Sequence, residues 1–229
     1  MNQKTEVEKL ILLLREKSSP EGQNGQKRFG ISGRNLLGVS IYDIRKISKG
    51  IHDHEIALAL WASEVHDARL MACFVDIPEK VTREQMDSWV ADFDSWDICD
   101  QVTTSLFDLT PFAPNAVFEW AKSEEEFTRR AAFSTIAGLA SHNHEMMDKD
   151  FENYFPLIRE YSLDPRNFVK KGVNWALRNI GKRNDSLLVK CIQFAEELHQ
   201  TDDRTARWIA SDALRELRKR MNLIEGTKL

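Results

Sequence analysis

The stretch Pro165–Arg183, which reads PRNFVKKGVNWALRNIGKR, decides the fold of this 229-residue chain. Proline is tolerated at the start of a helix because its missing N–H has no partner in the first turn. Apolar side chains then recur every three or four residues, as on the buried face of an amphipathic helix. These side chains are Val169, Val173, Ala176 and Ile180. The stretch is therefore predicted to be a helix that packs along this face.

Helical periodicity continues on both sides, and no segment alternates like a strand between hairpin turns. The predicted helices have about 9 to 20 residues and short connectors, which is typical of helix pairs stacked as a bundle or a solenoid. They include residues 41–49 after an N-cap at Ser40, and residues 124–141, 146–161, 185–199 and 203–221. A loop or short irregular element is predicted over Ser18–Gly38, which holds Pro20 and five glycines. We expect a single all-α domain over residues 1–229, with no repeat period recognisable by eye.

The bulk composition limits the possible classes of protein. No run of about 18 apolar residues could span a membrane, and the polar N-terminus, Met1–Lys9, does not resemble a secretory signal. Three separated cysteines without a CxxC pair argue against a disulfide framework or a zinc site, and suit a reducing cytoplasm. We therefore expect a cytoplasmic protein without metal. A net charge of -4 argues against nucleic-acid binding unless a local basic patch exists.

Such a basic patch is present within Pro165–Arg183, which contains no acidic residue. On a helix, Trp175 lies near Lys171 and Arg178, four residues before it and three after it. An aromatic ring flanked by cations suits contact with a sugar-phosphate backbone. A tryptophan packed at a helix interface among solvated lysines is the alternative. The basic residues of the stretch are Arg166, Lys170, Lys171, Arg178, Lys182 and Arg183.

A second stretch, residues 89–101, reads WVADFDSWDICDQ and is rich in tryptophan and aspartate. Asp94 or Ser95 can cap the following helix, and Asp97 then favours its N-terminal dipole. Asp100 lies four residues after Trp96, so both side chains share a helix face. A carboxylate beside an aromatic ring suits stabilisation of a cation, whereas a capping or salt-bridged aspartate is the alternative.

Other charged groups are less informative. Arg129 and Arg130 point about 100° apart on a helix, so one of them at most faces a given groove, and a surface salt bridge is the ordinary role of either. The histidine pairs His52/His54 and His142/His144 are two residues apart, which is not the spacing of a zinc site on a helix. No phosphate-binding loop or nucleophile motif is present.

Taken together, the motifs resemble those of the AlkD-like family of DNA glycosylases, the alkylation-repair proteins with HEAT-like repeats. The similarity runs in the same order from about residue 5 to 220, nearly the whole chain. The motifs are SWDICD at 95–100, RRAAF at 129–133 and VKKGVNWALR at 169–178, supported by KRF at 27–29, LGV at 37–39, Leu60-Trp61 and Arg69.

The resemblance implies a curved α-solenoid of HEAT-like repeats with a concave DNA-binding face. It also implies a monomer without a cofactor that removes cationic N3- or N7-alkylated purines from duplex DNA. Trp96 and Trp175 resemble the tryptophans that contact the sugar and backbone at the lesion, and Asp100 resembles the catalytic aspartate. Arg130, rather than Arg129, resembles the arginine that holds a phosphate.

DNA-binding roles are expected at the basic positions and at the KRF motif. These residues are Lys170, Lys171, Arg178, Lys182, Arg183, Arg28 and Phe29. Phe29 departs from the pattern, because relatives can carry tyrosine there, so any hydrogen bond from that hydroxyl to DNA is lost. Two alternatives are a non-catalytic DNA-binding paralogue and a helical-repeat scaffold that binds protein.

Overall fold

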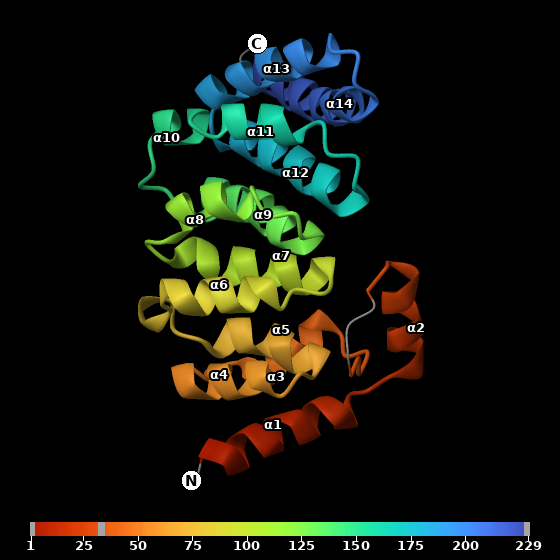
Figure 1. Cartoon of the computed structure of the whole chain (residues 1–229), viewed down its shortest axis with the longest axis vertical. Coiled ribbons are helices and arrows are strands. Elements are labelled where there is room, and N and C mark those ends of the chain that lie inside the picture. Colours follow the sequence, from red (N-terminus) through yellow and green to blue (C-terminus); the bar gives the residue numbers. More distant parts are fainter. Residues whose placement is uncertain (1–2, 32–34, 227–229) are drawn as a thin grey trace. The chain divides into compact units, whose positions relative to one another are not determined.

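The computed structural model describes residues 3–31 and 35–226, and every regular element among them is a helix (Figure 1). The chain divides into two compact units, Met1–Thr110 and Pro111–Leu229. No helix in the described ranges is long and apolar enough to cross a membrane. The protein is therefore all-α, as the periodicity predicts.

The first unit consists of short helices, several of which begin at a capping side chain. The described elements are α1 (Gln3–Glu16), α2 (Pro20–Arg28), α3 (Ile41–Ser48), α4 (His54–Ala62), α5 (His66–Val75), η1 (Pro78–Lys80), α6 (Arg83–Ala91), α7 (Trp96–Ser105) and η2 (Phe107–Leu109). Ser40, Asp53 and Thr82 each accept a hydrogen bond from the backbone N–H three residues later. These bonds define the starts of α3, α4 and α6, and the cap predicted at Ser40 is confirmed.

The second unit contains several longer helices, and its helices lie in successive layers (Figure 1). They are α8 (Ala113–Trp120), α9 (Glu126–His142), α10 (Asp148–Glu152), α11 (Phe155–Tyr161), α12 (Asn167–Arg183), α13 (Asp185–His199) and α14 (Arg204–Gly226). Within this unit α8 lies beside α9, α11 beside α12, and α13 beside α14 (Figure 1). Every residue of α9 from Arg130 to Ala140 is buried, and helices buried on all sides form the centre of a core.

Several contacts between corresponding helices of the second unit share a sequence separation of 38 residues. Hydrogen bonds with this separation are Arg130–Phe168, Asn179–Ser141, Asn174–Asp212, Arg178–Glu216, Lys190–Glu152 and Arg159–Glu197. Because successive contacts advance in the same direction on both helices, α9, α12 and α14 run parallel. This separation is the length of a helical repeat.

In the first unit, the residues that bond between neighbouring layers are separated by fewer residues in the sequence. The Trp61 indole N–H donates to Asp92, and His66 bonds to Asp97; both pairs are 31 residues apart. The rings of Trp61 and Trp89 stack with their centroids 4.1 Å apart. Unequal separations in the two units explain why no fixed period is visible in the sequence.

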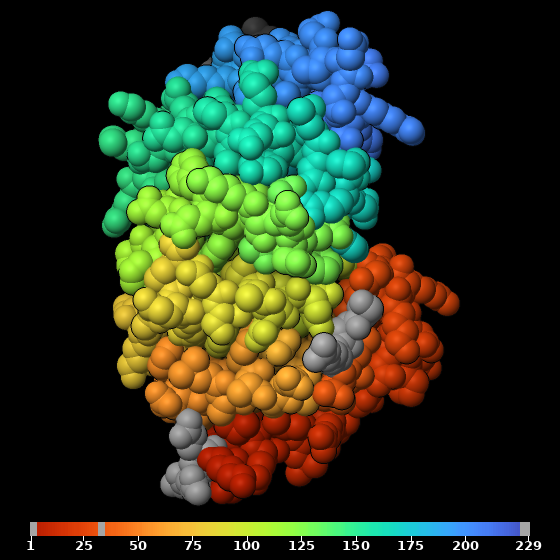
Figure 2. All heavy atoms as spheres, in the orientation of Figure 1, coloured from red at the N-terminus to blue at the C-terminus, as the bar shows by residue number. Residues whose placement is uncertain are grey.

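Helix α2 lies in the segment that the sequence predicts to be irregular. Ser19 caps it by accepting the N–H of Gly22 at 3.1 Å, and Pro20 occupies the first turn. A Cβ at Gly22 would lie 2.1 Å from the carbonyl oxygen of Gly38, so glycine permits a close backbone contact there. In Figure 2 the orange-red atoms of this segment form a protrusion at one side of the first unit. The predicted loop is thus partly wrong, and its residues 32–34 lie outside the described ranges.

The single helix predicted over residues 146–161 is also wrong, because the structure contains two helices there. Pro156 has no N–H to donate to the carbonyl of Glu152, so the helix cannot continue through it. It occupies instead the first turn of α11, where proline is accommodated.

Candidate functional site

Trp96 and Asp100 lie one turn apart on α7 of the first unit, so their spacing places both on one face. Trp96 is half-buried, and its indole N–H donates to the carbonyl of Phe29 at 2.9 Å, which fixes the orientation of the ring. The Asp100 residue is only 9% exposed. A carboxylate in such surroundings acts on nearby charge more strongly than one in water.

Two more carboxylates of residues 89–101, those of Asp92 and Asp97, bind neighbouring side chains. Asp92 accepts the indole N–H of Trp61 at 3.0 Å and forms an ion pair of 3.6 Å with Arg69. Asp97 bonds to the buried ring of His66 at 2.8 Å and accepts the hydroxyl of Ser95. Asp97 therefore does more than favour the helix dipole, and Ser95 begins α7 without a side-chain cap of its own.

The structure separates Arg129 from Arg130 in the second unit. Arg129 forms a 2.6 Å ion pair with Asp164, donates to a backbone carbonyl and lies over the ring of Tyr161. Arg130 points instead toward α12, where it donates to the carbonyl of Phe168 at 2.6 Å. Only 6% of Arg130 is exposed. Arg129 thus forms the expected salt bridge, and Arg130 packs on α12.

Asp164 holds the start of α12 in place. Its carboxylate accepts hydrogen bonds from Arg166 and Arg129, and it also accepts the backbone N–H of Arg166. Burial by itself raises the pKa of Asp164, but the hydrogen bonds from Arg166 and Arg129 outweigh burial and lower the pKa to about 2. Arg166, one of the basic residues of the patch, is therefore neutralised locally.

Trp175 is half-buried on α12, one turn after Gly172. An added Cβ at Gly172 would meet Phe133 at 3.4 Å and Arg130 at 3.5 Å, so this glycine lets α9 and α12 approach closely. Trp175 and Arg130 consequently belong to two helices in direct contact within the second unit.

Acidic residues of α14 neutralise part of the basic patch. Arg178 and Lys182 both form ion pairs with Glu216, and Asn174 donates to Asp212. Burial by itself raises the pKa of Glu216, but Lys182 and Arg178 produce a net lowering. Pro165–Arg183 contains no acidic residue, but its surface is not free of acids. Glu216, which pairs with Arg178, lies 38 residues later on the next parallel helix, α14.

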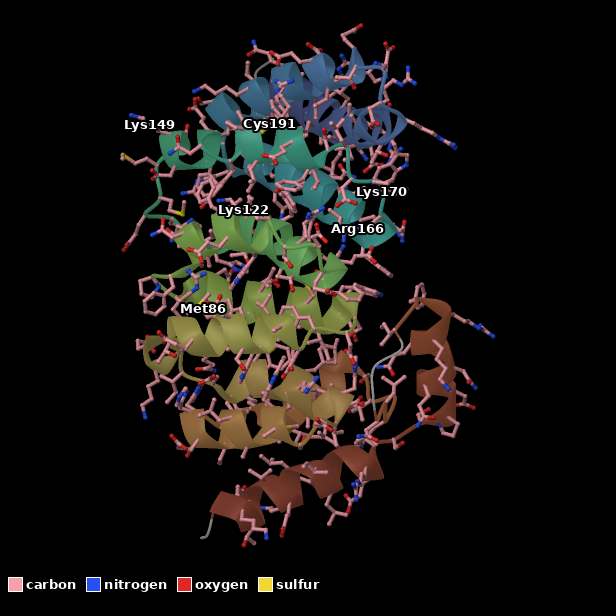
Figure 3. The ribbon with its side chains drawn as sticks, viewed as in Figure 1. Met86, Lys122, Lys149, Arg166, Lys170 and Cys191 are labelled. Carbon is pink, nitrogen blue, oxygen red and sulfur yellow. The ribbon has the colours of Figure 1, made fainter. Side chains whose placement is uncertain are left out.

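The remaining predicted cations have different surroundings. Lys171 is exposed, whereas the ammonium of Lys170 lies 5.0 Å from the centroid of the Trp208 ring. Figure 3 shows Lys170 and Arg166 at the N-terminal end of α12. Arg183 donates to the carbonyl of Met146 at 2.8 Å, in the connection between α9 and α10, a contact that the sequence does not predict. Trp208 is 40% exposed, and the sequence does not identify it as a candidate site residue.

Arg28 and Phe29 lie at the exposed C-terminal end of α2 in the first unit. The Phe29 residue is 73% exposed, although its carbonyl binds the Trp96 indole. In the first unit the structure thus joins Phe29 to Trp96, which shares α7 with Asp100, and in the second it places Arg130 against α12. No cluster of three or more His, Cys, Asp or Glu side chains suited to a metal occurs among the described residues.

Comparison with known proteins gives one family match. The family described as "DNA alkylation repair enzyme" matches residues 10–217, which cover most of both units. A search of curated proteins finds no match.

Two solved structures are similar over most of this chain. One is described as "A new family of proteins related to the HEAT-like repeat DNA glycosylases with affinity for branched DNA structures"; it is 18% identical, with a TM-score of 0.74, and the match covers 94% of this chain and 95% of that one. The other is smu.31 from Streptococcus mutans UA159, 18% identical with a TM-score of 0.55, covering 87% of this chain and 97% of that one. At this level of identity the likeness establishes the fold, which is that of HEAT-like helical repeats.

Proposed function

Because the chain belongs to the family of DNA alkylation repair enzymes, we propose that it is a DNA glycosylase. Its proposed substrates are cationic N3- or N7-alkylated purines in duplex DNA. It hydrolyses the bond between C1′ of the sugar and the base, so water adds a hydroxyl to C1′ in place of the base and its remaining proton passes to the solvent. The observation that carries this proposal is the buried residue Asp100, one helical turn from Trp96, whose indole is held by a hydrogen bond.

The chemistry of these lesions suits a site of this composition. Alkylation at N3 or N7 leaves a positive charge on the purine, and departure of the base takes up the bonding electron pair and neutralises that charge. A strong general acid is therefore unnecessary. The sugar becomes oxocarbenium-like as the bond breaks, as in other glycoside cleavages.

Asp100 is proposed to stabilise this developing sugar cation or to orient the attacking water. Trp96 is proposed to present its electron-rich ring to the same charge. The hydrogen bond to Phe29 removes rotational freedom from the ring before DNA arrives. Preorganised groups of this kind need no rearrangement as charge develops.

The second unit is proposed to bind the DNA backbone. Trp175 provides a ring for the sugar, Arg130 a guanidinium for a phosphate, and Lys171 an exposed charge. Trp208 and Lys170 extend this surface onto α14. Ion pairs of Arg178 and Lys182 with Glu216 weaken the attraction of this surface for phosphate. The salt dependence of DNA binding should therefore reflect fewer cations than the basic stretch contains.

The central test is single-turnover release of 7-methylguanine from methylated duplex DNA by wild type and Asp100→Asn. We expect release to fall by about 100-fold or more, as when other preorganised stabilising groups are removed, with DNA affinity unchanged. Asp87→Asn is the matched control, because Asp87 is an exposed carboxylate of the same unit. Near-normal release by Asp100→Asn would disprove the assigned role.

A separate test concerns Trp175→Ala. Loss of this ring should weaken DNA binding and base release together, because stacking on an aromatic ring contributes to both. Unchanged affinity across a salt titration would rule out a contact between Trp175 and DNA.

Binding of branched DNA without base release is a second candidate function. It is supported by likeness to the structure described as having affinity for branched DNA structures. Incubation with methylated duplex DNA and with a four-way junction separates the two functions. Free purine indicates the glycosylase, whereas junction binding without free purine indicates the second candidate.

A further inference from the structure

His66 begins helix α5, and it is 1% exposed. Its Nε2 lies 2.8 Å from a carboxylate oxygen of Asp97 in the first turn of α7. The other oxygen of that carboxylate accepts the hydroxyl of Ser95 at 2.7 Å. His66 and Ser95 thus hold Asp97 from both sides, beside Trp96 in the sequence.

Asp67, the next residue of α5, is fully buried and makes a second connection. Its two carboxylate oxygens accept the backbone N–H groups of Leu37 and Val39 at 2.7 and 2.8 Å. The carbonyl of Leu37 in turn accepts the N–H of Ser19, which caps α2. Helix α2 ends next to Phe29, whose carbonyl receives the indole N–H of Trp96.

Both connections therefore end at Trp96. One runs through Asp97 to the backbone of α7, and the other runs through residues 37–39 and α2 to the indole nitrogen. We propose that His66 and Asp67 are positioning residues that fix the Trp96 ring and the first turn of α7, and with it Asp100. This inference rests on the proposed function for the roles of Trp96 and Asp100, but the geometry that it describes is independent of the reaction.

The charges around His66 agree with this role. Burial by itself lowers the pKa of His66, but the hydrogen bond and charge of Asp97, with Asp67 and Asp94 nearby, raise it overall. The Nδ1 atom is buried and has no hydrogen-bond partner among the described residues. Asp97 is therefore the group that orients the ring, and the Nε2–H bond to Asp97 exists in both the neutral and the charged forms of His66.

The test compares His66→Leu, which removes the bond to Asp97, with His66→Gln, whose amide N–H can reach a position similar to that of Nε2. Each protein is labelled with fluorotryptophan, and the Trp96 resonance is assigned by its loss in Trp96→Phe. We expect His66→Leu to shift that resonance and to slow 7-methylguanine release by about 10- to 100-fold, the scale of a small misplacement in an active site. His66→Gln should restore both, and Asp100→Asn should leave the resonance near its original position.

Each outcome decides between the claims. An unchanged resonance and release rate in His66→Leu would overturn the positioning role, as would a failure of His66→Gln to restore them. If wild type releases no base, the proposed function fails, and the resonance alone then decides the positioning role. If His66→Leu does not fold, Ser95→Ala is used instead, because it removes the hydrogen bond from the Ser95 hydroxyl to Asp97. Its readouts are again the Trp96 resonance and the rate of 7-methylguanine release.

Discussion

The indole N–H of Trp96 donates a hydrogen bond of 2.9 Å to the carbonyl of Phe29, which is 67 residues earlier in the chain. This bond joins α7 to the exposed end of α2. It connects Phe29 to the helix that carries both Trp96 and Asp100, within the first unit. The ring of Trp96 is therefore held at its nitrogen as well as by its helix.

Trp96→Phe keeps an aromatic ring but removes the donor to Phe29. The loss of one such bond corresponds to about 1 kcal/mol, so α2 should open more often and base release should fall several-fold. Hydrogen exchange in residues 20–29 measures the opening of α2. Asp100→Asn serves as the comparison, because it should slow base release by about 100-fold or more without changing exchange in α2.

Gly22→Ala should detach α2 from the first unit. The added Cβ would lie 2.1 Å from the carbonyl of Gly38, and a backbone atom cannot rotate away as a flexible side chain can. Gly25→Ala is a matched control on the same helix, because a Cβ there meets nothing within 4 Å. The control should be neutral or stabilising by up to about 1 kcal/mol from helix propensity. Thermal unfolding and exchange in α2 compare the two variants, and equal behaviour would contradict the packing described.

Asp164→Asn should destabilise the second unit by about 2 kcal/mol, because Arg129 and Arg166 lose their shared charged acceptor. The folded pKa of Asp164 is about 2, below its ordinary value of 3.8. Its contribution to stability is therefore complete above the unfolded pKa and is lost as the pH falls through the folded pKa. Urea unfolding at about pH 6 and about pH 3 should show a smaller difference between wild type and variant at the lower pH. A difference independent of pH would exclude this cause.

Glu216→Gln removes the acid that pairs with Arg178 and Lys182. Freed cations should bind duplex DNA more tightly, and the slope of log affinity against log salt should steepen by about 1 to 2. Glu196→Gln removes an exposed acid that pairs with Arg218 and provides the control. If Glu216→Gln and Glu196→Gln change the salt slope equally, then Arg178 and Lys182 do not face DNA.

Much of the helical architecture follows from sequence because helix signals are local. The apolar spacing in Pro165–Arg183 and the cap at Ser40 each act within a few residues, so α12 and α3 are predictable. The four-residue spacing of Trp96 and Asp100 likewise predicts their shared face. Predictions failed where one residue outweighed the pattern, as Pro156 does between α10 and α11.

What only the tertiary structure decided depends on residues that are distant in sequence. The choice between Arg129 and Arg130 follows from Asp164 and Phe168 on a neighbouring layer, and the basic patch meets Glu216 one repeat later. The burial of His66 and its bond to Asp97 likewise cannot be predicted from the residues next to His66 in the sequence. Charge pairing and burial arise between side chains that folding brings together. The sequence alone therefore determined which groups are present. Packing decided which of these groups are bound to one another.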